Sequence, residues 1–396
     1  MGDLLVRNVR PMGGAAVDVL VLNGRVAEVG PAIAPVSVPV LDGRGDLLLP
    51  GLVEAHTHLD KTMWGMPWLP HQAGPRLIDK IETERRLRRE RDIDPERQSE
   101  RQALQSLRMG STHIRSHVDV DTEVGLAGVE GVMRMRERLQ DRIWVEIVAF
   151  PQSGLLVRPG TLDLVRDALR LGAEVVGGLD PCAIDRDPKG HLDAIFGLAE
   201  SFGRPVDIHL HEPGELGAFS MELIIERTRA LGLQGRVVVS HAFCLGMPDR
   251  AYARSLMEQL ARERIAVMTT GAPSRPVPPL SECVEVGLTV CAGSDGIRDS
   301  WSPYGNADML ERAMLIGLRN NLRRDDEIGM ALEACTHGGA AALALPDYGI
   351  GEGCVADLLL VPGEVPAEAV VTRPANRTVV KNGRVVVRDG QLMMLH

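Results

Sequence analysis

The amino-acid sequence predicts an α/β fold, a (β/α)8 TIM barrel accompanied by a small β-sandwich domain formed by both chain termini. Two observations lead to this prediction. Short apolar stretches alternate with amphipathic helical stretches over about 290 residues, which is typical of a parallel barrel. Both ends of the chain instead contain short strands joined by tight turns. We therefore expect residues 51–345 to form the barrel, and residues 1–50 and 346–396 to form the small domain.

The terminal segments carry hairpin signals. Asn23-Gly24 follows the alternating stretch 17–22, and Asn382-Gly383 separates two valine-rich stretches near the other end. Asn-Gly between such stretches favours a two-residue β-turn. Neither end is long enough to bury a hydrophobic core by itself. The two ends are therefore expected to form one domain together.

The middle of the chain supplies the barrel. The expected strands are residues 46–54, 112–120, 143–150, 174–179, 206–210, 236–240, 265–270 and 288–292. The expected helices are residues 162–171, 191–202, 221–231 and 249–264, with one or two more in the charged segment 77–109. In such barrels the active groups lie at the C-terminal ends of the strands. Candidate functional residues are therefore sought where each apolar stretch stops.

Composition and charge exclude several classes of protein. The chain has 44 Lys and Arg against 54 Asp and Glu, a net charge of −10, which is the wrong sign for a nucleic-acid partner. The basic run 85–89 is interleaved with acidic residues and is interpreted as an exposed helix face. No apolar stretch approaches the roughly 18 residues needed to span a bilayer. The six cysteines include no C-x-x-C pair, which favours a reduced compartment. We expect a cytoplasmic protein without nucleic-acid or membrane partners.

His56 and His58 lie at the C-terminal end of the first expected barrel strand, just after residue 54. Residues two apart on a strand share a face, so both imidazoles point the same way and can bind one borderline metal such as zinc or ferrous iron. A bare His-x-His is also compatible with two hydrogen-bonded surface histidines. His209 lies near the end of a further expected strand, and His241 and Asp295 each follow another. Ligand-type residues at four strand ends of one barrel favour a shared metal site.

These motifs form a recognisable set. They are Pro-Gly-Leu-Val-Glu-Ala-His-Thr-His-Leu-Asp at 50–60, Ser-His-Val-Asp-Val at 116–120, Ala-Phe-Pro-Gln-Ser-Gly at 149–154, Ile-His-Leu-His-Glu at 208–212, Ser-His-Ala at 240–242 and Gly-Ser-Asp at 293–295. The set resembles the amidohydrolase superfamily, and within it the cytosine deaminase-like branch with its triazine N-alkylamidohydrolase relatives. The likeness extends over nearly the whole chain.

The resemblance implies one divalent metal ion, Zn²⁺ or Fe²⁺. Its ligands would be His56, His58, His209 and Asp295. Members of the superfamily with two metals use a lysine on the fourth strand, and the expected strand 174–179 contains none. A single-metal site is therefore favoured.

The resemblance also implies the catalytic roles. His241 would bind the attacking water or the developing oxyanion, and Asp295 would help to take the proton of that water. Glu212 would pass the proton to the ring nitrogen and the leaving amine, and Gln152 would orient the carbonyl–amide edge of the substrate. General chemistry supports such a set, because a dication lowers the pKa of bound water from about 15.7 to about 7. A carboxyl group with a raised pKa suits the proton transfer.

Other substrate contacts leave alternatives open. His211 shares a strand face with His209, whereas Glu212 lies on the other face unless the chain turns near residue 210. His211 is therefore a rival contact. His117 is expected either to border the pocket or to hydrogen-bond in the core, and Trp301 either to stack on a flat heterocycle or to pack at the rim. Another charged residue in the first motif region, Lys61, is interpreted as a surface or supporting cation.

The substrate is less closely defined. Gly296 stands where the pyrimidine deaminase pattern often has a second Asp, and segment 297–306 resembles the triazine relatives, yet those relatives carry Asp at the position of Glu212. Our first expectation is a deaminase that releases ammonia from cytosine or a close analogue. The alternative is an N-alkylammelide or triazine-type amidohydrolase that releases an alkylamine. A catalytically inactive barrel with a structural metal would leave Glu212 and His241 without a role. We also expect a homo-oligomer, as is common for such barrels.

Overall fold

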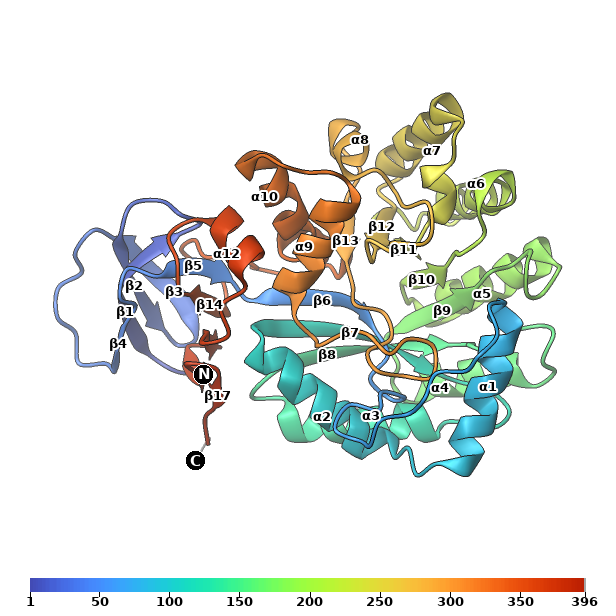
Figure 1. The fold of residues 1–396 in the computed structure, drawn as a ribbon, viewed down its shortest axis with the longest axis horizontal. Helices are drawn as coiled ribbons and strands as arrows, with labels where there is room; N and C mark the ends of the chain where they lie inside the picture. The colour runs from blue at the N-terminus through green and yellow to red at the C-terminus, as the bar shows by residue number, and fades with distance from the viewer. Residues whose placement is uncertain (395–396) are drawn as a thin grey trace.

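The computed structural model describes residues 1–394 and contains a small β domain beside a larger α/β barrel (Figure 1). The expected division at residue 50 falls between two strands of different sheets, and the one at residue 346 falls between the last barrel helix and the next strand. The last two residues of the expected segment 346–396 lie outside the described part.

The barrel is a parallel eight-stranded sheet whose strands follow one another in chain order. The strands are β6 (Leu52–Thr57), β7 (Ser111–Asp119), β8 (Trp144–Phe150), β9 (Val175–Leu179), β10 (Val206–His209), β11 (Val237–Ser240), β12 (Ala266–Thr269) and β13 (Val290–Ala292). The helices around them are α1 (Leu77–Glu90), α2 (Pro95–Arg108), α3 (Ala127–Leu139), α4 (Thr161–Leu171), α5 (Pro188–Phe202), α6 (Gly214–Ala230), α7 (Arg250–Arg262), α8 (Leu280–Glu285), α9 (Met309–Arg319), α10 (Asp325–Ala334) and α11 (His337–Ala342), with a short 3-10 helix at Phe243–Gly246. The predicted (β/α)8 fold is confirmed.

The first and last barrel strands meet beside the predicted metal ligands. A parallel bridge joins Thr57 to Asp295, and the backbone N–H of Asp295 donates to the carbonyl oxygen of His56 at 2.9 Å. A Cβ atom at Gly293 would lie 2.5 Å from that same carbonyl oxygen, so this approach needs a glycine. Asp295 has φ of 60°, a conformation that non-glycine residues rarely adopt and that the surrounding bonds must hold.

The expected first strand, residues 46–54, is wrong. It is two strands, β5 (Leu47–Pro50) and β6, which belong to different sheets and are separated by Gly51. A Cβ atom at Gly51 would lie 2.2 Å from Oγ1 of Thr112 on β7, so the chain passes close to its neighbour at this break. Both strands are buried on both faces, and the apolar stretch therefore runs through the break without a change of pattern.

The small domain combines strands from both chain ends. Besides β5 these are β1 (Leu4–Pro11), β2 (Val17–Leu22), β3 (Arg25–Gly30), β4 (Val40–Asp42), β14 (Leu358–Val361), β15 (Thr378–Lys381), β16 (Arg384–Arg388) and β17 (Gln391–Leu392), with helix α12 (Pro366–Thr372) between β14 and β15. The N-terminal and C-terminal strands join where β5 pairs with β14. A buried cluster that includes Val6, Val19, Leu358 and Val380 fills the space between the two halves. Figure 1 shows β1 and β17, the first and last strands of the described chain, in this domain.

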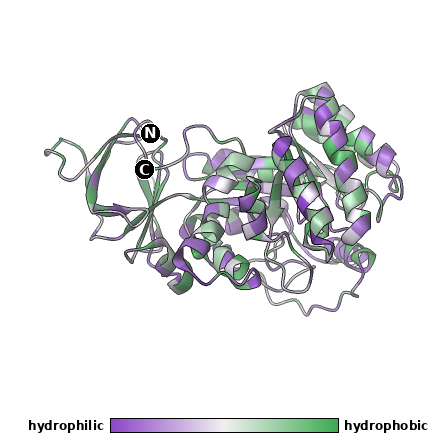
Figure 2. Cartoon of the chain, turned by 90° about the horizontal axis from the view of Figure 1, so that it is seen from above, coloured by the Kyte–Doolittle hydropathy of each residue, from purple (hydrophilic) through white to green (hydrophobic). Residues whose placement is uncertain are grey.

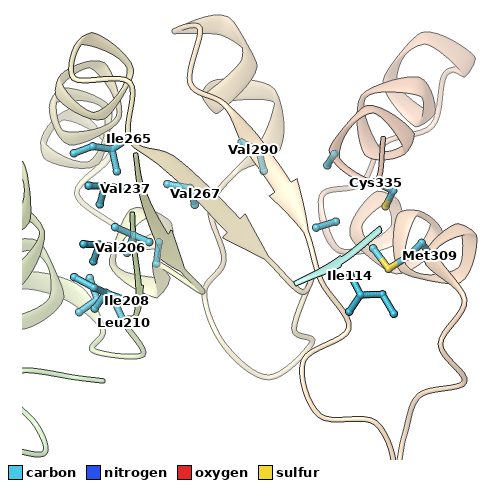
Figure 3. Packing of buried hydrophobic residues seen from close by; sticks show 14 of the residues in the cluster. Ile114, Val206, Ile208, Leu210, Val237, Ile265, Val267, Val290, Met309 and Cys335 are labelled. Atoms are coloured by element: carbon cyan, nitrogen blue, oxygen red, sulfur yellow. The ribbon is translucent and has the colours of Figure 1, made fainter. Parts of the chain in front are cut away.

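Apolar packing between the barrel strands and the helices leaves polar residues pointing inward. Val206 and Ile208 of β10 belong to the main buried cluster with Val237 and Val267 (Figure 3). Alternation along a strand then turns Asp207 and His209, also buried, to the other face. Figure 2 shows hydrophilic and hydrophobic residues alternating along the surrounding helices, as one-sided packing requires. No helix within residues 1–394 is long and apolar enough to cross a bilayer.

Candidate active site

The four side chains predicted to bind a metal meet at the C-terminal end of the barrel. His56 lies near the end of β6 and His58 just after it, His209 ends β10, and Asp295 follows β13. One possible ligand atom from each residue lies within 4.8 Å of the others. The Nε2 atoms of His58 and His56 are 3.1 and 3.7 Å from Oδ1 of Asp295. Three separate strands therefore bring these groups to one point.

Hydrogen bonds behind this group fix the rings of His56 and His58. Nδ1 of His58 lies 2.9 Å from the carbonyl oxygen of His117, so this nitrogen must donate. Nδ1 of His56 lies 2.9 Å from Oγ of Ser240, which itself donates to Asp207 at 2.7 Å. The Ser240 oxygen therefore accepts from His56. In both rings Nε2 is left with the lone pair that a metal ligand needs.

Burial keeps the imidazoles of His58 and His209 neutral. It lowers the pKa of His58 to about 4 and holds the pKa of His209 well below the usual range. Burial opposes ionisation of Asp295, but the neighbouring rings of His56 and His58 outweigh it and hold the pKa of this carboxyl well below its usual range. Neutral imidazoles beside an ionised carboxylate are a donor set for a divalent metal.

Several ring nitrogens at this point lack hydrogen-bond partners within the described residues. They are Nε2 of His56, both ring nitrogens of His209 and Nε2 of His241, all buried. An unpaired buried nitrogen costs free energy, and a bound cation would remove that cost. The Asp295 side chain is 41% exposed whereas His56 is fully buried, so the group is open on one side only. These residues fit a divalent metal with an accessible position.

A cavity of about 780 Å³ borders the open side of the group. His58, His209 and Asp295 line it, and its other walls come from the loops after β6, β8, β10, β12 and β13 and from α1 and α9. The volume lies within the range of about 300–1,000 Å³ that is common for small-molecule sites. Its position agrees with the expectation that active groups lie at the C-terminal strand ends.

Three of the four predicted substrate contacts line this cavity: Gln152, His211 and Trp301. The fourth, His117, is fully buried and is absent from the lining. Its Nε2 atom lies 3.5 Å from Oδ2 of Asp207, behind the metal group. Contact between His117 and the substrate stays a prediction that the lining of the cavity does not support.

His241 lies beside the metal group, beneath His211. Its ring centroid is 5.1 Å from that of His56 and 5.2 Å from that of His209. The rings of His241 and His211 stack at 4.3 Å, and Nδ1 of His211 lies 2.8 Å from Oδ2 of Asp180. His211 rather than His241 borders the cavity. The location of His241 agrees with the predicted role, which stays a prediction.

Glu212 is turned away from the cavity. β10 ends at His209, so the chain does turn before Glu212, as the predicted role requires. However, Oε1 accepts from the backbone N–H groups of Cys182 at 2.7 Å and Ala183 at 2.8 Å, and Oε2 accepts from the hydroxyl of Ser220. Burial raises the pKa of Glu212. Its role as acid and base stays a prediction, and it would require the carboxyl to leave these donors.

Lys61 is a site residue that the sequence interpretation did not identify. It is buried and lines the cavity, and its Nζ atom donates to Oε1 of Gln152 at 2.8 Å. Nζ also lies 3.3 Å from Glu84 and 3.4 Å from Asp119. An ammonium group only donates hydrogen bonds, so it fixes the amide of Gln152 with the oxygen toward Lys61. Its place directly after the metal-binding motif was the one available signal.

The basic run 85–89 on α1 is not simply an exposed face. Arg88 is mostly buried and its Nη2 atom lies 2.9 Å from Asp60 and 2.8 Å from Asp119. Arg85 pairs with Asp121 at 3.0 Å, while Arg86 remains exposed. The expectation is therefore wrong for the half of the run that faces the barrel. Helical spacing of arginines opposite buried carboxylates cannot be recognised without knowing the partners.

Comparison with known proteins agrees with this geometry. The model of the amidohydrolase family matches residues 133–392, more than half of the chain. The chain belongs to the amidohydrolase family. The family match and the similar proteins described below show that the chain is a hydrolase acting on C–N bonds. They also confirm the resemblance to the cytosine deaminase-like branch.

Three relatives of this amidohydrolase are informative. The chain is 30% identical over 399 residues to the N-isopropylammelide isopropyl amidohydrolase of Pseudomonas sp. strain ADP, and the match covers 98% of each chain. The crystal structure of N-isopropylammelide isopropylaminohydrolase from Burkholderia multivorans has 48% identity and a TM-score of 0.96, covering 99% of this chain and 100% of that one. The crystal structure of 5-methylcytosine deaminase from Klebsiella pneumoniae with 5-fluorocytosine has 27% identity and a TM-score of 0.84, covering 99% and 98%.

Proposed function

We propose that this amidohydrolase uses one divalent metal ion, Zn²⁺ or Fe²⁺, to hydrolyse the exocyclic C–N bond of an oxo-triazine with an N-alkylamino group. The products are an alkylamine and the corresponding oxo ring. The observation that carries this choice is the 48% identity over 99% of the chain with the N-isopropylammelide isopropylaminohydrolase of Burkholderia multivorans. The cavity of about 780 Å³ supports it, because a single six-membered ring leaves room for an alkyl substituent. The alternative that the sequence left open is thus preferred over ammonia release.

The metal would be held by His56, His58, His209 and Asp295, and when bound it supplies a water of lowered pKa. The half-exposed carboxylate of Asp295 can accept the proton of that water. His241 lies within reach of the same point and would donate to the developing negative charge. These positions support the assignments.

The substrate ring would lie in the cavity. Gln152 would orient its carbonyl edge, and Trp301 offers a flat face for stacking. Glu212 would carry the proton to the ring nitrogen and the leaving amine, and its raised pKa suits a proton donor. His211, which borders the cavity, would contact the substrate directly.

Deamination of an aminopyrimidine such as cytosine is the second candidate. It is favoured by the likeness to the 5-methylcytosine deaminase of Klebsiella pneumoniae, 27% identical over 99% of this chain. Glu212 also favours it, because the resemblance noted from the sequence implies Asp at this position in the triazine relatives. The two candidates differ in the amine that leaves.

Turnover assays on purified, metal-loaded protein separate the candidates. We expect alkylamine from N-alkylated dioxotriazines and little ammonia from cytosine or 5-methylcytosine. Ammonia release from aminopyrimidines without alkylamine release would overturn the choice. If stoichiometric metal is bound and neither substrate class reacts, a barrel with a structural metal is favoured instead.

Two substitutions test the catalytic assignments. We expect Asp295→Ala and Glu212→Gln each to lower kcat/KM by about 100-fold or more, since positioned acids and bases contribute about 10²–10⁴-fold. Steady-state kinetics measure this, and circular dichroism checks the fold. Ser220→Ala is the matched control for Glu212, because it removes only one donor to that carboxyl. A Glu212→Gln enzyme with normal kcat would contradict the acid–base assignment.

Assembly and location follow as further proposals. We expect a homo-oligomer that acts in the cytoplasm on a small heterocycle. Sedimentation equilibrium on the full chain measures the assembly state, and a monomer at micromolar concentration would contradict the first expectation.

A further inference from the structure

Gly296 follows the metal ligand Asp295 and borders the cavity without a side chain. A Cβ atom at this position would lie 1.9 Å from Oδ2 of Asp299 and 2.7 Å from its Cγ. The backbone of Gly296 is outside the left-handed region, so space and not backbone conformation excludes a side chain here. The volume that a side chain at 296 would fill is taken by the carboxyl of Asp299.

The loop after β13 holds this carboxyl by one oxygen. Oδ1 of Asp299 accepts from the backbone N–H groups of Trp301 at 2.8 Å and Ser302 at 2.9 Å. Oδ2 has no hydrogen-bond partner in the described part of the chain, and Asp299 lines the cavity although it is only 1% exposed. The second oxygen therefore lies against Gly296 at the wall of the cavity, where it is free to accept from a ligand.

The same cavity carries a complementary donor. Because Lys61 donates to Oε1 of Gln152 at 2.8 Å, the Nε2 group of Gln152 is the part of the amide left for a ligand. Burial raises the pKa of Asp299 to about 6, which Lys61 partly opposes, so the carboxylate is still the main form at pH 7.5. A carboxylate only accepts hydrogen bonds. Asp299 thus offers an acceptor and Gln152 a donor to a bound ring.

We propose that Asp299 is a specificity-determining residue that accepts a hydrogen bond from a ring N–H, while Gln152 donates to a ring carbonyl. The site then selects heterocycles with a cyclic amide edge, in which C=O and N–H are neighbours. This selection of a cyclic amide edge deepens the proposed function, because dioxotriazines carry such an edge. It rests on the proposed function only for the identity of the ring. Gly296 is required because it makes room for the Asp299 carboxyl.

Ligand affinity of the metal-loaded protein tests the proposal without turnover. The probes are 1,3,5-triazine-2,4,6-trione, which has ring N–H groups, and its N-trimethyl derivative, which has none. We expect Asp299→Asn to weaken trione binding by about tenfold or more, because a bond to a charged acceptor is lost. This variant keeps the oxygen that accepts from Trp301 and Ser302 and replaces only Oδ2 by a donor. Binding of the trimethyl probe should change by less than about threefold.

A second variant displaces the carboxyl without removing it. In Gly296→Ala the new methyl group meets Oδ2 of Asp299, so we expect a similar loss of trione affinity. Gly317→Ala on α9 is the matched control, because a Cβ atom there meets nothing within 4 Å. The double variant Gly296→Ala/Asp299→Asn should bind the trione no more weakly than the worse single variant, since both changes act on one contact.

Three results would overturn the proposal. The first is an unaltered protein that fails to bind the trione at millimolar concentration. The second is a trione affinity that is unchanged in both single variants. The third is an equal loss of affinity for the trione and for the trimethyl probe. Failure of the proposed function would appear differently, as an unaltered protein that binds the trione but releases no alkylamine. The Asp299 comparison would then still stand on the measured affinities.

Discussion

Single residues behind the candidate metal ligands fix the orientation of the rings. Ser240 accepts from His56 and donates to Asp207, so it fixes which nitrogen of His56 would face a bound metal. The carbonyl of His117 does the same for His58. Such outer contacts hold a ligand ring in its binding orientation before the metal arrives.

Ser240→Ala removes this support for His56. We expect metal affinity to fall about 10–100-fold, the usual effect of losing an outer contact of a ligand histidine. Competition with a chromophoric chelator measures it. Ser201→Ala is the control, because the Ser201 hydroxyl only donates to the carbonyl of Gly197 within α5. Unchanged affinity in Ser240→Ala would show that Ser240 does not orient the ring.

Asp299 also gives a pH dependence of stability. Its pKa is raised by burial from 3.8 to about 6 in the folded protein, so the folded state binds the extra proton between these values. The free energy of unfolding therefore falls as pH rises from about 4 to about 6, by up to about 3 kcal/mol from this group. Denaturant unfolding at pH 4 and pH 7 measures this change. The free energy of unfolding of the unaltered protein should fall by this extra amount between the two pH values, and that of Asp299→Asn should not. Parallel curves for the two proteins would contradict it.

Among the elements, α9 depends on the small domain. Asp308 caps α9 by accepting from the N–H of Leu310 at 2.9 Å, and it is bound by both Nη atoms of the buried Arg377, at 2.7 and 2.8 Å. Arg377 directly precedes β15, whereas α9 lines the cavity. One ion pair thus connects the C-terminal part of the small domain to a wall of the active site.

Arg377→Met leaves the Asp308 carboxylate buried without its cation. We expect the free energy of unfolding to fall by about 3–5 kcal/mol, as for other broken buried pairs. Urea unfolding measures it. Arg324→Met is the matched control, because Arg324 pairs with Asp326 at the surface, where an ion pair contributes less than about 1 kcal/mol. Equal, small effects of the two substitutions would contradict a structural role for Arg377.

For the molecule as a whole, a metal would join distant parts of the barrel. Its candidate ligands come from β6, β10 and β13, and β6 and β13 are the first and last strands. The charge of the bound cation would also complete the pairing of the buried nitrogens. We therefore expect metal binding and barrel stability to be coupled.

Zinc should stabilise the chelator-treated protein. At 100 times its Kd we expect a gain of about 2.7 kcal/mol, seen as a rise in Tm. Ca²⁺ should have little effect, since it prefers oxygen ligands. His209→Ala should abolish the zinc-dependent rise, because it removes a ligand from the middle of the barrel. A full zinc response in that variant would exclude His209 from the metal group.

Much of the fold and the metal group could be predicted, because the signals are local. Alternating apolar stretches mark strands wherever they pack, and the ends of parallel barrel strands converge regardless of the intervening loops. His56, His209 and Asp295 could therefore be placed together before any coordinates. The break at Gly51 could not, since β5 and β6 are both fully buried and read as one apolar stretch.

The sequence by itself determined the barrel, the sharing of one domain by the two termini, and the residue types that surround the candidate metal site. Only the tertiary structure decided which charges are buried and where their free atoms point. It placed Lys61 under Gln152, turned Glu212 toward backbone N–H groups, and put the carboxyl of Asp299 in the space left by Gly296. These outcomes depend on partners far apart in the chain, and the orientation of a hydrogen-bonding side chain is set by those partners and not by its neighbours in sequence.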